Sequence, residues 1–552
     1  MNRRRAVAFV ALVLSSATLR AAAAAPEVVA VVACDPYAEL KKQIRWVGTL
    51  VGQPQLDALA ESPLMIATQF KGLAGLDVSR PLGLVVTADG EMPVVHGYVP
   101  VKDLDRLLDS LSGMLGPVEK ADGVRRVSPP GGMPLDIVEK DGWAIIGPQG
   151  AAAPVADPTE SFAGVVKQFA LGIQAFPSRM PEAMREQLRA GLDQAAAVAA
   201  AQGQRIDPAG PAAAVENLRE TEWLILGIAI DMERERIYLE AQSRATAESP
   251  AAAALTEVAK GSTTVATVVP ADGKPPAVSM HLAAAVPESL RKAVIDGLAA
   301  MRADEGAEAA ATTAVSILRE TLVAMIEGGG YDAAFTIDTS TVTAESRIPL
   351  VTLGARVKDG RDLETRIKKV VGDAGAVPGL KAEFGAGEAA GAKLHRLTLQ
   401  DVGVPGADAI DVTLAVAPNY AWVLAGGDVP ARLAAVAGAS GKPDVNVKPM
   451  ADLNVALGPL LRYLAVLARA DGEAAADPDG LEAAAAAADA EKSALVQLLV
   501  RPIQRGMALR LSADAGAVRT VAKSVNRLPA AARPGVPATG GPDPIPFAVP
   551  VQ

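Results

Sequence analysis

One order of strands and helices occurs twice along the chain, and this recurrence constrains the fold more than any other feature. Each copy ends with a turn, a tryptophan, three aliphatic or small residues and a glycine, at Trp143–Gly147 (WAIIG) and Trp422–Gly426 (WVLAG). Alternation of apolar residues indicates strands before both endings, and a period near 3.6 residues indicates a helix. In the first copy we expect strands over 82–88, 93–101, 123–128 and 134–139, a last strand over the WAIIG ending, 143–147, which WVLAG matches in the second copy, and a helix over 102–115. In the second copy we expect strands over 348–357, 393–399 and 410–417 and a helix over 361–371.

We interpret this recurrence as a diverged internal duplication within an α+β fold. A chain of 552 residues is too long for a single core, so more than one domain is expected. The sequence predicts two related domains of antiparallel sheet and helix, joined by a helical middle segment. The expected divisions are a first domain over 28–147, a linker over 148–160, a helical segment over 161–222 and a second domain over 223–527 that contains the diverged repeat, 348–438.

Six apolar residues at helical spacing mark the middle segment, which we expect to form one or two helices broken near Pro177. They are Phe162, Val165, Val166, Phe169, Ile173 and Phe176. This face could pack in a core or between domains, or it could form a groove for a hydrophobic ligand, a lipid or a partner helix.

Further along the chain, the expected elements are a hairpin over 223–244, a helix that begins at Ser249-Pro250, helices over 452–468 and 481–500, and a strand pair within 505–521. Ser249 has the residue type of an N-cap, and Pro250 would occupy the first helical position. The Pro-, Gly- and Ala-rich tail, 528–552, can bury little apolar surface, so we expect it to be disordered.

The first 24 residues have the pattern of a secretory signal peptide. Arg3, Arg4 and Arg5 form a basic start, an apolar run follows from Ala6 to Leu14, and small residues lie at 21–25. The apolar run is shorter than the roughly 20 residues that span a bilayer, and no later run reaches that length. We therefore expect export to the periplasm or the extracellular space, with no transmembrane helix in the mature chain.

The formal net charge of −10 and the lack of a basic stripe exclude nucleic-acid binding from the expected functions. The same acidity disfavours electrostatic docking on anionic lipid. Cys34 is the only cysteine, so an intrachain disulfide is impossible and the fold must rest on packing. Val31–Cys34 loosely resembles a lipoprotein cleavage box, which makes Cys34 a possible lipidation site. Because Arg20, Pro26 and Glu27 interrupt the apolar run, a buried structural cysteine is favoured instead.

The sequence contains no complete motif for catalysis, cofactor binding or metal binding. His96, His281 and His395 each lie in an expected strand without a second ligand at metal-binding spacing. Gly438–Lys442 lacks the first glycine of a phosphate loop, and Gly385–Gly387 has the wrong spacing for a dinucleotide turn. The acidic residues Asp103, Asp105, Asp109, Asp477 and Asp479 are interpreted as solvated helix surface and helix starts. We assign no catalytic, cofactor-binding or metal-binding residue and expect no cofactor.

At its paired WAIIG and WVLAG endings the chain resembles large secreted bacterial proteins of unknown function that repeat strand–strand–helix units. The resemblance extends over about 28–528, and it implies location and architecture without assigning a functional residue. The expected function is that of an exported, non-enzymatic binding or scaffold protein. The alternatives are a carrier that holds a hydrophobic ligand or lipid between a curved sheet and a helix, and a hydrolase with dispersed site residues.

Overall fold

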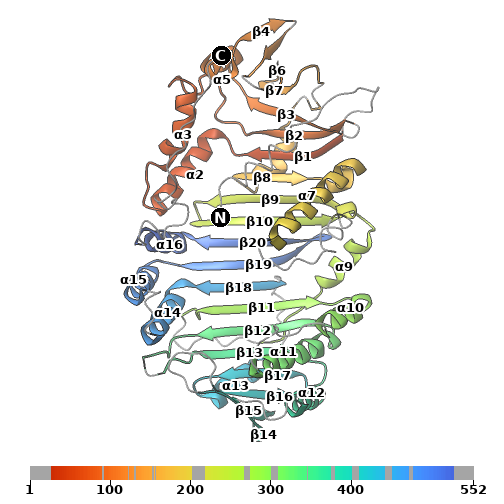
Figure 1. The fold of residues 1–552 in the computed structure, drawn as a ribbon, viewed down its shortest axis with the longest axis vertical. Helices are drawn as coiled ribbons and strands as arrows, with labels where there is room; N and C mark the ends of the chain where they lie inside the picture. The colour runs from red at the N-terminus through yellow and green to blue at the C-terminus, as the bar shows by residue number, and fades with distance from the viewer. Residues whose placement is uncertain are drawn as a thin grey trace.

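A computed structural model describes residues 27–527, apart from short gaps at 90–91, 122, 130–131, 152–153, 156, 202–214, 216–217, 266–273, 300–308, 345, 374–378, 401–408, 442–449 and 472–476. The expected leader, 1–24, and the expected disordered tail, 528–552, lie outside the described residues. The described part is an α+β fold, as predicted, built on one antiparallel sheet of 20 strands (Figure 1).

The strands pair in a single continuous ladder. Its order is β4–β5–β6–β7–β3–β2–β1–β8–β9–β10–β20–β19–β18–β11–β12–β13–β17–β16–β15–β14. The first ten strands are β1 (Glu27–Cys34), β2 (Leu82–Asp89), β3 (Met92–Pro100), β4 (Val118–Ala121), β5 (Val124–Val127), β6 (Leu135–Lys140), β7 (Trp143–Pro148), β8 (Leu171–Ala175), β9 (Thr221–Asp231) and β10 (Arg236–Ala245). The others are β11 (Val278–Ala285), β12 (Gly330–Asp338), β13 (Leu350–Arg356), β14 (Leu380–Ala389), β15 (Ala392–Gln400), β16 (Ala409–Ala417), β17 (Tyr420–Ala425), β18 (Ala451–Ala456), β19 (Leu495–Ile503) and β20 (Gly506–Asp514).

The two halves of the sheet have the same internal order. Reading from each outer edge, strands 4, 5, 6, 7, 3, 2, 1, 8, 9 and 10 of the first half correspond to strands 14, 15, 16, 17, 13, 12, 11, 18, 19 and 20 of the second. The halves meet where β10 pairs with β20, in a register that runs from Arg236 opposite Asp514 to Arg244 opposite Gly506. The strands of 28–147 and of 223–527, expected as separate domains, therefore belong to one sheet.

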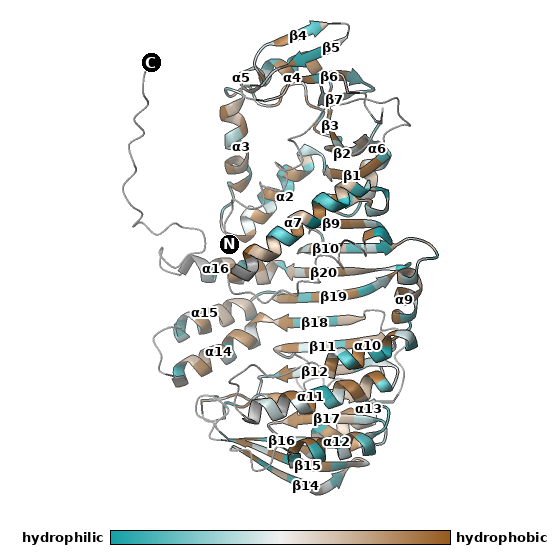
Figure 2. Cartoon of the chain, turned by 45° about the vertical axis from the view of Figure 1, so that its right-hand side comes forward, coloured by the Kyte–Doolittle hydropathy of each residue, from teal (hydrophilic) through white to brown (hydrophobic). Residues whose placement is uncertain are grey.

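Helices lie along both ends of the strands (Figure 1). One side carries α2 (Tyr37–Leu50), α3 (Leu56–Ala67), α14 (Leu457–Asp471), α15 (Pro478–Asp489) and α16 (Ala515–Arg527). The other carries α9 (Pro250–Val258) and α10 (Glu288–Ala299), whereas α7 (Glu182–Ala201), α11 (Ala309–Glu327) and α12 (Gly360–Asp373) are drawn across the sheet (Figures 1 and 2). The remaining elements are α4 (Leu104–Ser110), α5 (Ser112–Leu115), α6 (Thr159–Val166), η2 (Pro177–Arg179) and α13 (Val429–Ala439). No described helix is long and apolar enough to cross a bilayer.

The two tryptophans of the repeated endings lie in the cores of the two halves. Trp143 of β7 forms edge-to-face contacts with Tyr98 and Phe162, at ring-centroid distances of 6.4 and 5.9 Å. Trp422 of β17 packs with Leu433 and Val436 of α13. Both tryptophans are buried, and both are located in the strands that the sequence predicted.

Several expected helices contain a strand. The middle segment is interrupted by β8, where Gly172 lets the strand pass against α6: a Cβ on Gly172 would lie 2.8 Å from Val165 Cγ1. The helix expected over 452–468 begins as strand β18, and the end of the helix expected over 481–500 is strand β19. The strand pair expected within 505–521 is strand β20 followed by helix α16. Short apolar runs fit either a buried strand or a helix, so periodicity alone did not separate them.

Candidate binding face

Seven large aliphatic side chains on the four central strands remain exposed. They are Leu171, Ile173, Leu226, Ile228, Leu239, Leu509 and Leu511, each 43–48% exposed, and we call them the apolar strip. Brown segments recur along the central strands in the hydropathy view (Figure 2). Isolated exposed leucines are ordinary on soluble proteins, but a contiguous set indicates an interaction site.

The register of the sheet shows that the strip is contiguous. Leu171 lies opposite Ile228, Ile228 opposite Leu239, and Leu239 opposite Leu511, so one row crosses β8, β9, β10 and β20. A second row runs through Ile173, Leu226, Ala241 and Leu509. Directly opposite residues point to the same face of a sheet, so both rows belong to one surface.

An apolar pocket of about 500 Å³ adjoins the strip at β8. We call it the β1–β3 pocket; Leu171 belongs both to its wall and to the strip, and other walls are formed by Val32, Leu84, Met133 and Ile146. Its volume lies in the range of small-molecule sites. No charged side chain of the described residues lines it.

A second apolar pocket of about 460 Å³ lies at the other end of the strip. We call it the α16 pocket, and its walls include Val51 after α2, Val496 of β19, Ala513 of β20 and Val521 of α16. Ala513 follows Leu511 by two residues in the same strand and therefore points to the same face. The two pockets and the strip thus form one apolar surface.

The opposite face of the same central strands carries buried charge. Glu240 of β10 is only 1% exposed, and Arg510 and Arg501 both bind its carboxylate, Arg501 at 3.1 Å. Gln242 donates to Glu240 at 2.6 Å and to Gln168 at 3.0 Å. Burial opposes ionisation of Glu240, but the hydrogen bonds from Arg510 and Gln242 hold the pKa of its carboxyl below the ordinary value. These strands therefore bury the Glu240 carboxylate on one face and expose leucines on the other.

Cys34, the possible lipidation site of the sequence, is the last residue of β1 and lines the β1–β3 pocket. Its Sγ lies 3.6 Å from the carbonyl oxygen of Leu82, and burial raises the pKa of the thiol to about 11. Because β1 pairs with both β2 and β8, cleavage before Cys34 would remove a strand from inside the sheet.

The three histidines lie in separate strands, His96 in β3, His281 in β11 and His395 in β15. His96 is 2% exposed, and neither ring nitrogen has a hydrogen-bond partner; burial lowers its pKa. His395 Nδ1 accepts from Gly385 N at 3.0 Å, and its Nε2 lies 3.6 Å from Glu364 Oε1. Burial lowers the pKa of His395 despite the nearby Glu364 carboxylate. No group of three potential metal ligands occurs within the described ranges.

The acidic residues considered from the sequence have structural partners. Asp103 caps α4 by accepting from Arg106 N at 3.0 Å, and Asp477 caps α15 by accepting from Gly480 N at 3.0 Å. Asp105 forms ion pairs with Lys120 and Arg125, and Asp109 with Lys71. Asp479 pairs with Arg469.

The predicted apolar face of the middle segment is divided between the core and the strip. Phe162, Val165 and Phe169 lie in the first core, with Val166 and Phe176 packed against it. Ile173 instead belongs to β8 and the strip. The alternation of apolar residues over 223–244 predicts that one face of this hairpin is apolar, and that face carries part of the strip. Alternation alone does not show whether other elements cover the face.

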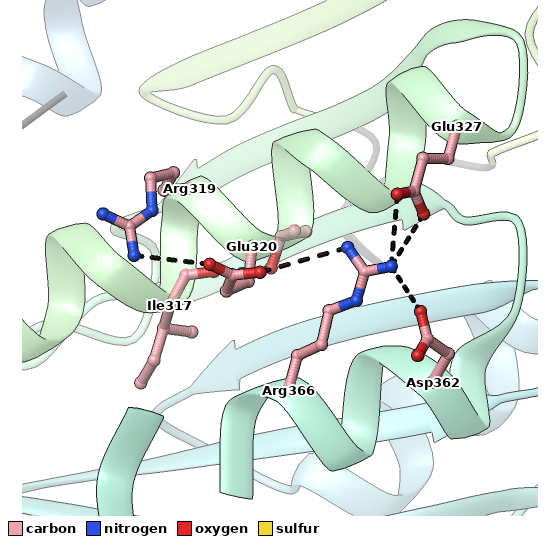
Figure 3. A network of polar contacts seen from close by, with 7 residues as sticks. Ile317, Arg319, Glu320, Glu327, Asp362 and Arg366 are labelled. Carbon is pink, nitrogen blue, oxygen red and sulfur yellow. Dashed lines mark hydrogen bonds and ion pairs between the residues drawn. The ribbon is translucent and has the colours of Figure 1, made fainter. Parts of the chain in front are cut away.

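In the second half, helices close the sheet face that the strip occupies in the centre. Leu509 connects through directly opposite residues to Val500, Ala451, Leu282, Ala333 and Ala355. Ala333 and Ala355 pack in a core with Ala324 and Met325 of α11. Arg366 of α12 holds α11 in place by binding Glu327 at 2.9 Å and Glu320 at 4.0 Å (Figure 3).

Comparison of the chain with protein-family models, with curated proteins and with solved structures finds no match.

Proposed function

We propose that this chain is an exported, non-enzymatic protein that binds apolar ligands on its exposed sheet face, acting as a carrier. The observation that carries the proposal is the apolar strip, seven aliphatic side chains each 43–48% exposed and contiguous across four paired strands. Burial of apolar surface is favourable by about 25 cal/mol per Å², so a ligand that covers the strip gains affinity from it.

The distribution of charge within the central strands supports the same conclusion. On the strip side, the four rows of opposite residues that run through Ile237, Leu239, Ala241 and Ser243 contain one polar side chain, Ser243, among apolar ones. On the other side, the central strands bury Glu240 under Arg510 and Arg501. Burying charged groups costs desolvation free energy. The central strands nevertheless place these charges on the face opposite the strip, which leaves the strip uncharged.

The pockets favour a carrier over the binding-or-scaffold alternative. A partner protein would cover a flat face, whereas pockets of about 500 and 460 Å³ at the two ends of the strip suit slender ligands. The basic start at Arg3–Arg5 and the apolar run that follows support export.

We also infer that the two halves of the sheet descend from a duplicated unit. The matching order of ten strands in each half supports this inference, as does the position of the WAIIG and WVLAG endings in the corresponding strands β7 and β17.

The proposal is tested with natively purified mature protein. Native mass spectrometry would report the N-terminus and any bound small molecule, and titration with the uncharged fluorophore Nile red would measure apolar binding. We expect the double variant Leu226→Ser/Leu239→Ser to lose most of the fluorescence increase. The matched control, Leu290→Ser/Leu318→Ser, changes helix leucines that are 44% and 43% exposed and should retain it. Equal fluorescence from both double variants would overturn the proposal.

A further inference from the structure

We infer that the strip and its two pockets form one site for a single long hydrocarbon chain of an uncharged lipid. This inference rests on the proposed function and specifies its ligand. The chain would lie across β8, β9, β10 and β20, with its two ends at the mouths of the β1–β3 pocket and the α16 pocket.

The length of the strip suits an acyl chain. Neighbouring strands lie about 4.8 Å apart, so three steps from β8 to β20 cover about 15 Å. The apolar core of a bilayer is about 30 Å thick, so one acyl chain also spans about 15 Å. A long chain can thus cross the strip and reach the mouths of both pockets, at Cys34 and at Ala513, whereas a short chain reaches one pocket alone.

The lining of the two pockets indicates an uncharged ligand. Among the described residues, the polar residues of the two linings are Cys34 and Tyr98 in the β1–β3 pocket and Gln53 in the α16 pocket, and the Tyr98 ring packs in the core on the other face of the sheet. The Tyr98 hydroxyl already donates to the carbonyl oxygen of Val155, at 2.9 Å. A buried carboxylate or phosphate needs charged or multiple hydrogen-bond partners, and neither pocket lining contains a cation.

The hydrogen bonding of the sheet disfavours an extended peptide as the occupant. Each of the four central strands is paired on both sides, so its backbone donors and acceptors are already used within the sheet. A peptide strand lying flat on this face would bury its own backbone groups without partners, which is costly. A hydrocarbon chain has no such groups.

The two halves of the protein provide an internal comparison for the β1–β3 pocket. By order in the sheet, β11, β12 and β13 correspond to β1, β2 and β3, and there Met325 of α11 covers the face. In the first half, the helix pair at the same place in the chain is α2–α3. Its ion pairs join α2 to α3, with Arg45–Asp57 at 2.7 Å and Lys41–Glu61 at 2.8 Å, and no residue of either helix lines the pocket. The ligand would occupy the place that α11 fills in the second half.

Cys34 provides a reporter for one end of the site, because it is the only cysteine and lines the β1–β3 pocket. Its reaction with iodoacetamide, measured at one fixed alkaline pH, reports whether that pocket is occupied. The variant Cys34→Ala/Val521→Cys moves the reporter to the α16 pocket. If this variant does not fold, Cys34→Ala/Gln53→Cys places a thiol on the same pocket from another segment.

The probes are monoolein, which is neutral with a long chain, monocaprylin, which is neutral with a short chain, and oleate, which is anionic with a long chain. At a concentration of about ten times its Kd, a lipid leaves about one tenth of the sites free, so monoolein should slow alkylation of both reporters about tenfold. Monocaprylin at the same concentration should fail to protect both reporters together. Oleate should bind at least several-fold more weakly than monoolein.

The outcomes separate this inference from the proposed function. Displacement of the fluorophore by monoolein without protection of both reporters would overturn the single-chain site and leave the carrier function standing. Oleate that binds as tightly as monoolein would overturn the assignment to uncharged lipids. Binding of neither the fluorophore nor any lipid would overturn the proposed function itself.

Discussion

Glu240 and Arg510 face each other directly where the two halves of the sheet meet, and each is the fifth residue of its strand. One position supplies a carboxylate and the corresponding position in the other half supplies the guanidinium that binds it. Tyr238 covers this pair, with its ring centroid 4.2 Å from the Arg510 guanidinium carbon. Corresponding positions that carry opposite charge favour pairing between unlike halves, since two copies of either strand would bring like charges together.

Replacement of Glu240 by glutamine should destabilise the protein strongly. The variant removes the charged acceptor that Arg510 and Arg501, 26% and 42% exposed, bind at the buried position 240, which costs about 1.5–3 kcal/mol. The free energy of unfolding from urea denaturation measures this loss. Glu383→Gln is the matched control, because Glu383 and its partner Arg396 are exposed, and it should change stability by less than about 1 kcal/mol. A similar small effect at Glu240 would contradict the prediction.

Acidification should destabilise the protein partly through His96. Burial lowers the pKa of His96 in the folded protein below 6.5, the ordinary value for histidine. As the pH falls below 6.5, the unfolded chain takes up the proton first, so the free energy of unfolding decreases. Urea denaturation between about pH 7 and about pH 5 should show a smaller decrease for His96→Leu than for the native sequence. His395 has a shift of the same sign and remains in both proteins. An identical pH dependence of the two proteins would refute this role of His96.

A methyl group at Gly227 should disturb the first core. A Cβ there would lie 2.2 Å from Cγ of Phe169, which is 2% exposed and cannot move freely. Gly227→Ala should therefore cost about 1–3 kcal/mol, measured by thermal unfolding. Gly191→Ala in α7 meets no atom within 4 Å and should instead stabilise the helix by about 0.5–1 kcal/mol. A tolerated Gly227→Ala would show that Phe169 can repack.

The leucines of the strip should contribute little to stability. Leu226 and Leu239 are 48% and 43% exposed, so each change to serine should alter the free energy of unfolding by about 0.5 kcal/mol or less. By contrast, Ile137 is 2% exposed, and Ile137→Ala should cost about 2–5 kcal/mol. Equilibrium urea denaturation of the three variants tests this contrast. A large loss at Leu226 or Leu239 would mean that the strip is part of a core.

The elements with strong local signals could be predicted from the sequence. The tryptophan endings are strands β7 and β17, the alternating segment at 223–244 is the β9–β10 hairpin, and Ser249 caps α9 by accepting from Ala252 N. The strand at 495–503 could not be predicted in the same way, because its apolar run LVQLLVRPI has no period that distinguishes a strand from a helix. Strand β8 could not be predicted for a similar reason. The apolar residues before it, Phe162, Val165 and Phe169, are spaced as in a helix, and this spacing continues into the strand.

The apolar strip and its pockets could not be predicted from local sequence patterns. Alternation in β9 predicts that Leu226 and Ile228 share a face, but their exposure depends on which helices reach the central strands. The pairing of β10 with β20 joins segments separated by 270 positions, as in the contact between Glu240 and Arg510, and no short-range signal encodes it.

This distant pairing also has a consequence for synthesis. During translation, β10 emerges with only β9 as a neighbour, and its other edge must wait for almost the whole remaining chain before β20 can insert between β10 and β19. Until then the nascent protein presents an unpaired strand edge beside exposed leucines, a combination prone to misassembly. A chain with this topology therefore completes its central seam last, after β19 and β20 have been made.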